Sequence, residues 1–240
     1  MNEGAGISNF TGSMPGEGRI YGVVAGVVIK NDSANDADKP GPGRVKVKVP
    51  LIGMPESNWA RVASWMAGKD RGAFFLPEVD DEVLVMFENG DVNRPYVIGS
   101  LWNGKDTPPE TNKDGKNNLR VFKSRSGHLL EFADTKGEER ITITSAKGHV
   151  IRLDDKSGAE RIEIKDKSGS NGVLIDAKAN KVSIVSGKDI EISAPSGKLS
   201  LAAKTVELKS SADTTISAAA GMNVKASASM TIKGATVNIN

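Results

Sequence analysis

The sequence contains no cysteine and few aromatic side chains, and both shortages restrict the fold. The absence of cysteine excludes a disulfide framework and thiol chemistry. Aromatic residues make up 5% and hydrophobic residues 38% of the 240 positions, which is little for one large globular core but suits a long, narrow one. No segment approaches the roughly 18 consecutive apolar residues of a membrane-spanning helix. The N-terminal segment lacks the basic and apolar regions of a signal peptide, so none is expected.

The sequence is also poor in groups that catalyse reactions. Its two histidines, His128 and His149, occupy equivalent Gly-His positions of a repeat, which favours a role in turns, although Ser126 and Asp134 lie near the first of them. The glycine-rich stretches lack the strand–loop–helix context of a phosphate site. We therefore expect no catalytic residue, no cofactor and no metal site. A net charge of +2 gives no electrostatic case for nucleic acid.

Composition divides the chain into four parts. Residues 1–18 are glycine-rich and are expected to form a flexible N-terminal arm. Residues 19–102 are expected to form a compact β domain and residues 103–118 a polar linker. Residues 119–240 are repetitive and are expected to form one elongated β region.

About five expected strands in residues 19–102 indicate a small barrel such as the OB-fold. Residues 20–29 form an apolar run, and residues 44–50 alternate valine with charged side chains. Residues 58–65 fit a strand or a short helix. Two further runs, 82–87 and 95–102, flank an Asn-Gly pair, which is a strong hairpin signal.

The repeats change their period along the chain. Residues 126–143 match residues 147–164 at an offset of 21, and a shortened third copy covers residues 171–184. From Ile184 to Ile239, apolar residues then recur at spacings of 8, 9, 7, 8, 8, 8 and 7, and most have an apolar partner two residues earlier. Each of these units, here called an octad, predicts a short strand with one apolar face, followed by a turn.

An octad cannot close a β coil alone, because a strand of four or five residues, rising about 3.3 Å per residue, makes one side of a prism. Three chains wound about one axis would each supply a side and leave strand edges only at the two ends. We therefore expect an all-β chain, with an N-terminal OB-fold barrel followed by a C-terminal trimeric triple-stranded β-helix, or β-prism. The expected trimer core consists of Val182, Ile184, Ile190, Ile192, Leu199, Leu201, Val206, Leu208, Ile216, Met222, Val224, Met230 and Ile232.

Other assemblies of the octads remain open. A single-chain solenoid or an adhesive, amyloid-like segment would also show alternation, but the sustained spacing near eight favours the homotrimer. The sequence does not tell whether His128 and His149 bind an ion on the threefold axis.

Residues 74–104, FFLPEVDDEVLVMFENGDVNRPYVIGSLWNG, resemble the OB-fold signature of phage baseplate spike proteins and of the valine-glycine repeat (VgrG) proteins of type VI secretion. The elements that carry the resemblance are Pro77, Glu82-Val83, Phe87, Gly90-Asp91, Arg94-Pro95 and Gly99. Residues 126–143 also resemble the repeat that opens the β-prism in VgrG-like chains. The sequence departs from the family at Asp80, where glycine is usual.

The resemblance implies a non-enzymatic central spike, a membrane-puncturing needle of a contractile tail or injection system. Its OB-fold would dock on a baseplate hub, expected as a separate protein because this chain has no room for a hub domain. A tip protein of the PAAR-repeat class would dock on Val237, Ile239 and Asn240. Assembly is expected in the cytoplasm, within a phage tail or injection particle, with transient contact at or beyond the target cell envelope.

Two further functions remain open. A trimeric tail fibre or adhesin would need exposed aromatic platforms for glycans, which the octads lack. An OB-fold nucleic-acid binder with a trimerising tail would need aromatic side chains interleaved with Lys46 and Lys48, and none is present. The sequence does not distinguish a phage tail from an extracellular injection system or a type VI secretion system, and it names neither target cell nor payload.

Overall fold

The computed structural model describes residues 19–238, and the chain divides into two units, Met1–Gly187 and Lys188–Asn240. The described residues contain strands and three short 3-10 helices but no α-helix, so the all-β class is confirmed. The 3-10 helices are η1 (Ser33–Asn35), η2 (Pro50–Ile52) and η3 (Glu88–Gly90). Within this range, no helix has the length and apolarity to cross a membrane.

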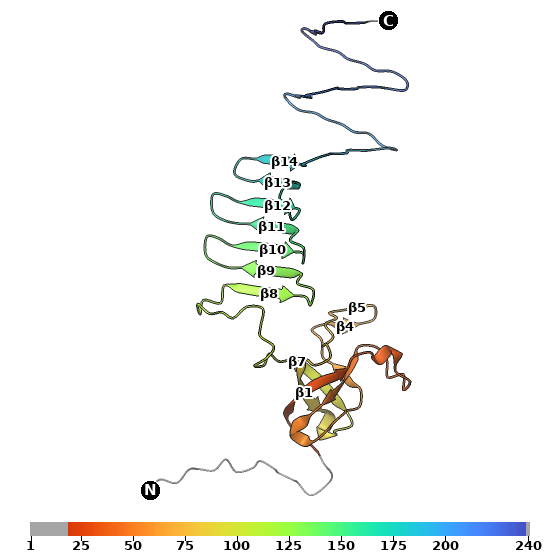
Figure 1. Cartoon of the computed structure of the whole chain (residues 1–240), viewed down its shortest axis with the longest axis vertical. Coiled ribbons are helices and arrows are strands. Elements are labelled where there is room, and N and C mark those ends of the chain that lie inside the picture. The colour runs from red at the N-terminus through yellow and green to blue at the C-terminus, as the bar shows by residue number, and fades with distance from the viewer. Residues whose placement is uncertain (1–18, 239–240) are drawn as a thin grey trace. The chain divides into compact units, whose positions relative to one another are not determined.

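Five strands close into a barrel in the order β1-β2-β3-β7-β6 (Figure 1). Their bounds are β1 (Val23–Lys30), β2 (Arg44–Lys48), β3 (Ala60–Val62), β6 (Glu82–Phe87) and β7 (Pro95–Ser100). All neighbours are antiparallel except β3 and β7, which are parallel. The expected barrel is therefore confirmed, and segment 58–65 contributes a strand. A small hairpin of β4 (Ala67–Gly68) and β5 (Arg71–Gly72) lies outside the barrel sheet and was not expected.

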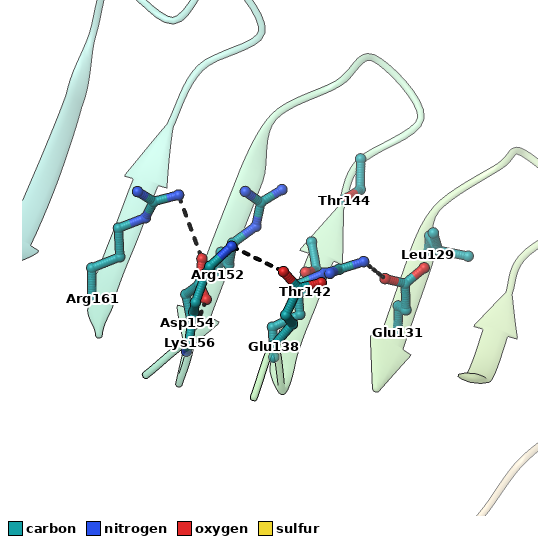
Figure 2. Close-up of a pocket in the computed structure, with 10 residues that line it drawn as sticks. Leu129, Glu131, Glu138, Thr142, Thr144, Arg152, Asp154, Lys156 and Arg161 are labelled. Atoms are coloured by element: carbon teal, nitrogen blue, oxygen red, sulfur yellow. Dashed lines mark hydrogen bonds and ion pairs between the residues drawn. The ribbon is translucent and has the colours of Figure 1, made fainter. Parts of the chain in front are cut away.

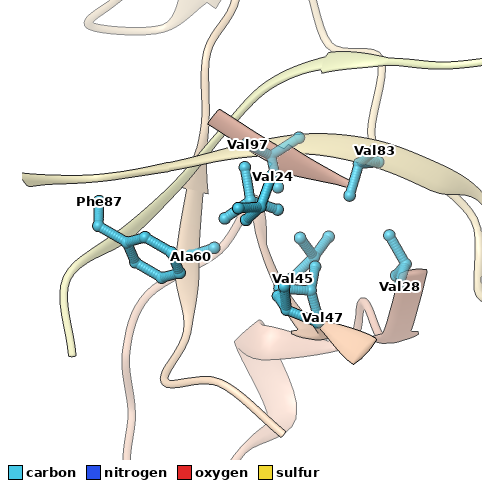
Figure 3. Close-up of a cluster of buried hydrophobic side chains, with 10 residues drawn as sticks. Val24, Val28, Val45, Val47, Ala60, Val83, Phe87 and Val97 are labelled. Carbon is cyan, nitrogen blue, oxygen red and sulfur yellow. The ribbon is translucent and has the colours of Figure 1, made fainter. Parts of the chain in front are cut away.

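Valine makes up most of the barrel core (Figure 3). Successive side chains of a strand point to opposite faces. Val45 and Val47 are therefore buried, while the alternating Arg44, Lys46 and Lys48 face outward. Val28, Val83 and Val97 complete the core from the other strands, each at most 1% exposed. Burying one valine stabilises a fold by about 1.5 kcal/mol or more, so the barrel holds a core of its own.

The turn that precedes β6 has a glycine-like backbone without a glycine. Asp80 has a φ of 76°, in the left-handed region that favours glycine. Its N–H donates to the carbonyl of Val28 at 2.9 Å, and Asp81 Oδ2 accepts the N–H of Glu78 at 2.8 Å. Asp80 therefore holds a backbone conformation that a glycine would adopt without strain.

Residues 119–185 form a seven-stranded antiparallel sheet in which every strand pairs with its neighbours in sequence (Figure 1). The strands are β8 (Leu119–Lys123), β9 (Leu129–Ala133), β10 (Arg140–Thr144), β11 (Val150–Asp154), β12 (Arg161–Lys165), β13 (Gly172–Asp176) and β14 (Lys181–Val185). The 21-residue repeat corresponds to two strands and their turns, since β11 and β12 begin 21 residues after β9 and β10.

The octads from Lys188 onward behave differently. Residues 188–238 run back and forth as extended chain, and none of these described residues belongs to a strand ladder (Figure 1). An octad holds one short strand and a turn, so backbone groups that find no partner in the single chain are available to a strand of another chain.

Candidate interaction site

The register of the seven-stranded sheet separates an apolar face from a charged face. Ile184 lies opposite Val173, which lies opposite Ile164, and this column continues through every strand of the sheet. The apolar face comprises Phe132, Ile141, Leu153, Ile162, Ile175 and Val182 in one column and Phe122, Leu130, Ile143, Ile151, Ile164, Val173 and Ile184 in the other. Val182 and Ile184, which were predicted as trimer-core residues, thus stand in the same two columns as the apolar residues of the longer repeats.

This apolar face is uncovered in the single chain. Ile164 is 50% exposed and Val182 is 64% exposed, although both residues belong to a regular sheet. The expected trimer-core positions show the same property, with exposed fractions from 50% at Met222 to 77% at Leu208. Exposed apolar surface that continues over so many strands is typical of an interaction surface. We therefore regard the apolar face and the octad apolar positions as the candidate interaction site.

The opposite face carries cross-strand charge pairs (Figure 2). Along one column, the residues directly opposite one another alternate in sign. They are Arg140, Asp154, Arg161, Asp176 and Lys181. Arg161 Nη2 lies 3.4 Å from Asp154 Oδ2, and opposite charges at such positions stabilise a sheet.

The charged face is packed more tightly than the apolar face. The side chain of Asp154 is 12% exposed and that of Glu163 is 19% exposed. On this face, a trough of about 400 Å³ is lined by Asp154, Arg140 and the buried Thr142, among others (Figure 2). Several charged side chains of this face thus form ion pairs within the chain, whereas the apolar face is uncovered in the single chain.

Both histidines close hairpin turns. The N–H of His128 donates to Ser124 Oγ at 3.0 Å, and the N–H of His149 donates to Ser145 Oγ at 2.9 Å. His128 Nδ1 also accepts the N–H of Ala146 at 3.2 Å. The backbone contact thus recurs in both copies of the repeat, and His128 adds a contact through its imidazole. No cluster of three or more histidine, aspartate or glutamate side chains able to hold a metal ion occurs in the described part of the single chain.

Two repeated glutamates have structural roles in the other turns. The backbone N–H of Gly158 donates to Glu160 Oε1 at 2.9 Å and lowers the pKa of that carboxyl. The pKa of Glu139, 21 residues earlier, is lowered by its own backbone N–H and then by that of Gly137. Both carboxylates therefore stay charged to lower pH than usual and fix the turns.

The barrel exposes an aromatic cluster that the sequence reasoning missed. Trp65 is 82% exposed and Phe75 is 70% exposed, and their ring centroids lie 6.1 Å apart. Trp65 also lies edge-on to Phe122 of β8, with ring centroids 6.2 Å apart, so the cluster consists of Trp65, Phe75 and Phe122. In the sequence, the consecutive pair Phe74-Phe75 was the signal for exposed aromatic side chains.

The expected tip-docking residues are placed only in part. Val237 lies at the end of the described range and is 48% exposed. Ile239 and Asn240 lie outside the described residues.

Comparisons with known proteins agree with this architecture. Residues 24–102 match the model of the "Type VI secretion system/phage-baseplate injector OB domain". The chain is 32% identical over 114 residues to the type VI secretion system spike protein VgrG3 of Vibrio cholerae, a match that covers 44% of this chain and 11% of the relative. It is 33% identical over 120 residues to the spike protein VgrG1b of Pseudomonas aeruginosa, covering 44% and 16%. A third relative, 30% identical over 114 residues, is the actin cross-linking toxin VgrG1 of Vibrio cholerae, covering 44% and 10%.

The barrel is therefore an injector OB domain of the type found in type VI secretion systems and phage baseplates. The resemblance inferred from residues 74–104 is confirmed, because the barrel matches the injector OB domain and the matched part of the chain is similar to VgrG spike proteins. The chain spans only about a tenth to a sixth of the length of these curated relatives.

Proposed function

We propose that this chain forms a homotrimeric central spike of a contractile tail or injection system, and that it acts mechanically rather than as an enzyme. Three copies would wind their octads about a common axis, with the apolar face of each seven-stranded sheet turned toward it. The spike homologues support the baseplate role. Sheath contraction would drive the resulting needle through a target envelope.

One observation carries this proposal. The chain places its longest continuous apolar surface in solvent while it packs its charged side chains against one another. Ile184 is 61% exposed, yet it stands in a column of apolar residues that extends across the whole sheet. Burying each such side chain would stabilise the assembly by about 1.5–3 kcal/mol. Three chains can bury these side chains against one another, whereas the single chain leaves them exposed.

We also assign the barrel to docking on a separate hub protein. The exposed Phe75 and Trp65 support this assignment, because tryptophan and other large aromatic residues are enriched in the buried centres of interfaces. Replacing Phe75 with serine should weaken capture of the hub protein without changing the mass of the particle, and Trp65 is kept because its ring also contacts Phe122 of the apolar face. Unchanged capture would contradict this assignment.

The same model includes a tip protein of the PAAR-repeat class that docks around Val237, Ile239 and Asn240. The exposed Val237 continues the apolar series and supports this location. Replacing Val237 and Ile239 with aspartate should abolish capture of the tip protein while the octads upstream keep the trimer together. Assembly would take place in the cytoplasm, and the spike would act at or beyond the target cell envelope.

Cysteine scanning tests the trimer directly, because the sequence has no cysteine of its own. Ile192→Cys places a thiol at an expected inward position, and Glu191→Cys places one at the neighbouring outward position as a matched control. Mild oxidation should link copies of the Ile192→Cys variant into covalent dimers on a non-reducing gel, and should leave the Glu191→Cys variant largely uncrosslinked. Equal cross-linking of the two variants would contradict the threefold winding.

A further inference from the structure

Two arginines of the barrel face one another without a counterion. Arg44 of β2 is the direct cross-strand partner of Arg61 of β3. Like charges directly opposite one another destabilise a sheet. Within residues 19–238, neither guanidinium forms an ion pair with a carboxylate.

A second like-charge pair in the same barrel shows how such a repulsion is normally relieved. Lys30 of β1 is the cross-strand partner of Lys46 of β2. Glu56 Oε1 lies 2.6 Å from Lys46 Nζ and 3.7 Å from Lys30 Nζ, so one carboxylate neutralises both cations. In the described chain, no acid occupies the corresponding place between Arg44 and Arg61.

The two arginines line a pocket of about 370 Å³ on the outside of the barrel. The other residues that line it are Trp59, Glu88, Asn93, Arg94, Pro95 and Tyr96. The indole Nε1 of Trp59 is buried and donates to no acceptor in the described structure. This N–H has almost no accessible surface, so it is not open to a ligand in the pocket, and Trp59 contributes only part of the wall. What the pocket offers a ligand is the two uncompensated positive charges of Arg44 and Arg61.

The remaining contacts in the pocket indicate the shape of the missing group. The guanidinium of Arg61 lies over the ring of Tyr96, with its central carbon 5.6 Å from the ring centroid, and this contact restricts the plane of its donors. Planar guanidinium groups match the two oxygens of a carboxylate.

The acid already present in the pocket is engaged elsewhere. Glu88 Oε2 accepts bonds from Arg94 Nη1 at 3.4 Å and from the Tyr96 hydroxyl at 3.5 Å. A polyanion such as nucleic acid would meet the negative charge of Glu88 in the same pocket, which favours a single carboxylate as the ligand.

We propose that this pocket is a receptor for one aspartate or glutamate side chain, carried by an acidic segment of a partner protein. The carboxylate accepts hydrogen bonds from Arg44 and Arg61, and it neutralises the opposed arginines as Glu56 neutralises the opposed lysines. The presence of a carboxylate-binding pocket does not depend on the proposed function. The inference that the carboxylate belongs to a docked partner protein rests on the proposed function.

The test uses the full chain labelled with 5-fluorotryptophan, which gives one ¹⁹F resonance for each of the three tryptophans. Trp59→Phe assigns the resonance of the pocket. The probes are a capped peptide Gly-Glu-Gly-Glu-Gly, the same peptide with glutamine for glutamate, and inorganic phosphate. The glutamate peptide should shift the Trp59 resonance saturably and leave the other two unchanged, while the glutamine peptide should have no effect.

Arg61→Gln should weaken binding of the glutamate peptide at least tenfold, and Arg44→Gln should do the same. Arg71→Gln, an exposed arginine of β5 outside the pocket, is the matched control and should bind the peptide as the unmodified chain does. Without any ligand, Arg61→Gln should raise the denaturant midpoint of the barrel because it removes the repulsion between Arg61 and Arg44. If Arg61 instead stabilised the fold, the same substitution would lower the midpoint.

Three outcomes would overturn the proposal. The first is equal binding of the glutamate and glutamine peptides, and the second is unchanged binding by Arg61→Gln. The third is tighter binding of phosphate than of the glutamate peptide, which would assign the pocket to a phosphate group instead. Because these titrations measure the pocket alone, each of these results leaves the trimeric spike untouched, and a failure of the trimer leaves the titrations interpretable.

Discussion

Ile184 is the direct cross-strand partner of Val173, and this pairing joins two parts of the sequence that have different periods. Ile184 begins the series of octads, whereas Val173 belongs to the last of the longer repeats. Both side chains lie on the apolar face of the sheet, so the residue that begins the octad series also belongs to that face.

The first prediction concerns this surface. Ile184→Asp places a charge on the apolar face, where it would be buried without a partner in the trimer, so it should lower the free energy of unfolding by more than about 2 kcal/mol per chain. Ser183→Asp is the matched control, because position 183 points to the opposite face. Chemical denaturation followed by circular dichroism measures both variants, and equal midpoints would show that the apolar face is not the buried one.

The second prediction concerns the charge column. Asp154→Asn removes the acid that stands opposite both Arg140 and Arg161, so Arg140 loses its directly opposite acid and Arg161 keeps only Asp176. We expect a loss of about 0.5–1 kcal/mol per chain. Asp155→Asn, the adjacent exposed carboxylate, should change stability by less than about 0.5 kcal/mol. An equal effect of the two substitutions would indicate that the loss reflects net charge rather than pairing.

The third prediction concerns the strained turn. Asp80→Gly removes the side chain from a residue with φ of 76° and should raise the free energy of unfolding of the barrel by about 1 kcal/mol. Asp81→Ala should lower it, because Asp81 Oδ2 accepts the N–H of Glu78. Thermal unfolding of the barrel gives both values. A destabilised Asp80→Gly variant would mean that the aspartate side chain makes a compensating contact.

The fourth prediction concerns pH. The hydrogen bond from Lys46 lowers the pKa of Glu56, so the folded state holds this carboxylate charged to lower pH than the unfolded chain does. The resulting stabilisation is present above the ordinary carboxyl pKa and is lost as the pH falls through the pKa of folded Glu56. Lys46→Gln should raise that pKa, which a ¹³C titration of the Glu56 carboxyl measures. An unchanged pKa would assign the shift to Lys30 instead.

The barrel could be predicted because its signals are local, such as the alternating valines of residues 44–50, which indicate a strand with one buried face. The repeat at an offset of 21 was visible in the sequence, but the antiparallel pairing of residues 119–185 within one chain was not expected. Cross-strand partners could not be predicted, because register depends on turn geometry. The alternation from Arg140 to Lys181 becomes visible only when the strands are paired.

The pocket at Arg44 and Arg61 was hidden from the sequence for a similar reason. These residues are separated by a loop and meet only through the pairing of β2 with β3. The octads pose the opposite difficulty. Their spacing is plain in the sequence, but the strands that would complete them belong to other copies, so the core assigned to Ile190 through Ile232 remains a prediction.

The mass of the particle in solution tests the account most directly. Light scattering on the purified full chain, coupled to size-exclusion chromatography, should give three times the chain mass of 25.3 kDa, and the value should not change on dilution to nanomolar concentration. A mass equal to one chain would contradict the trimeric spike, because the apolar face and the octads would then have no second copy to cover them.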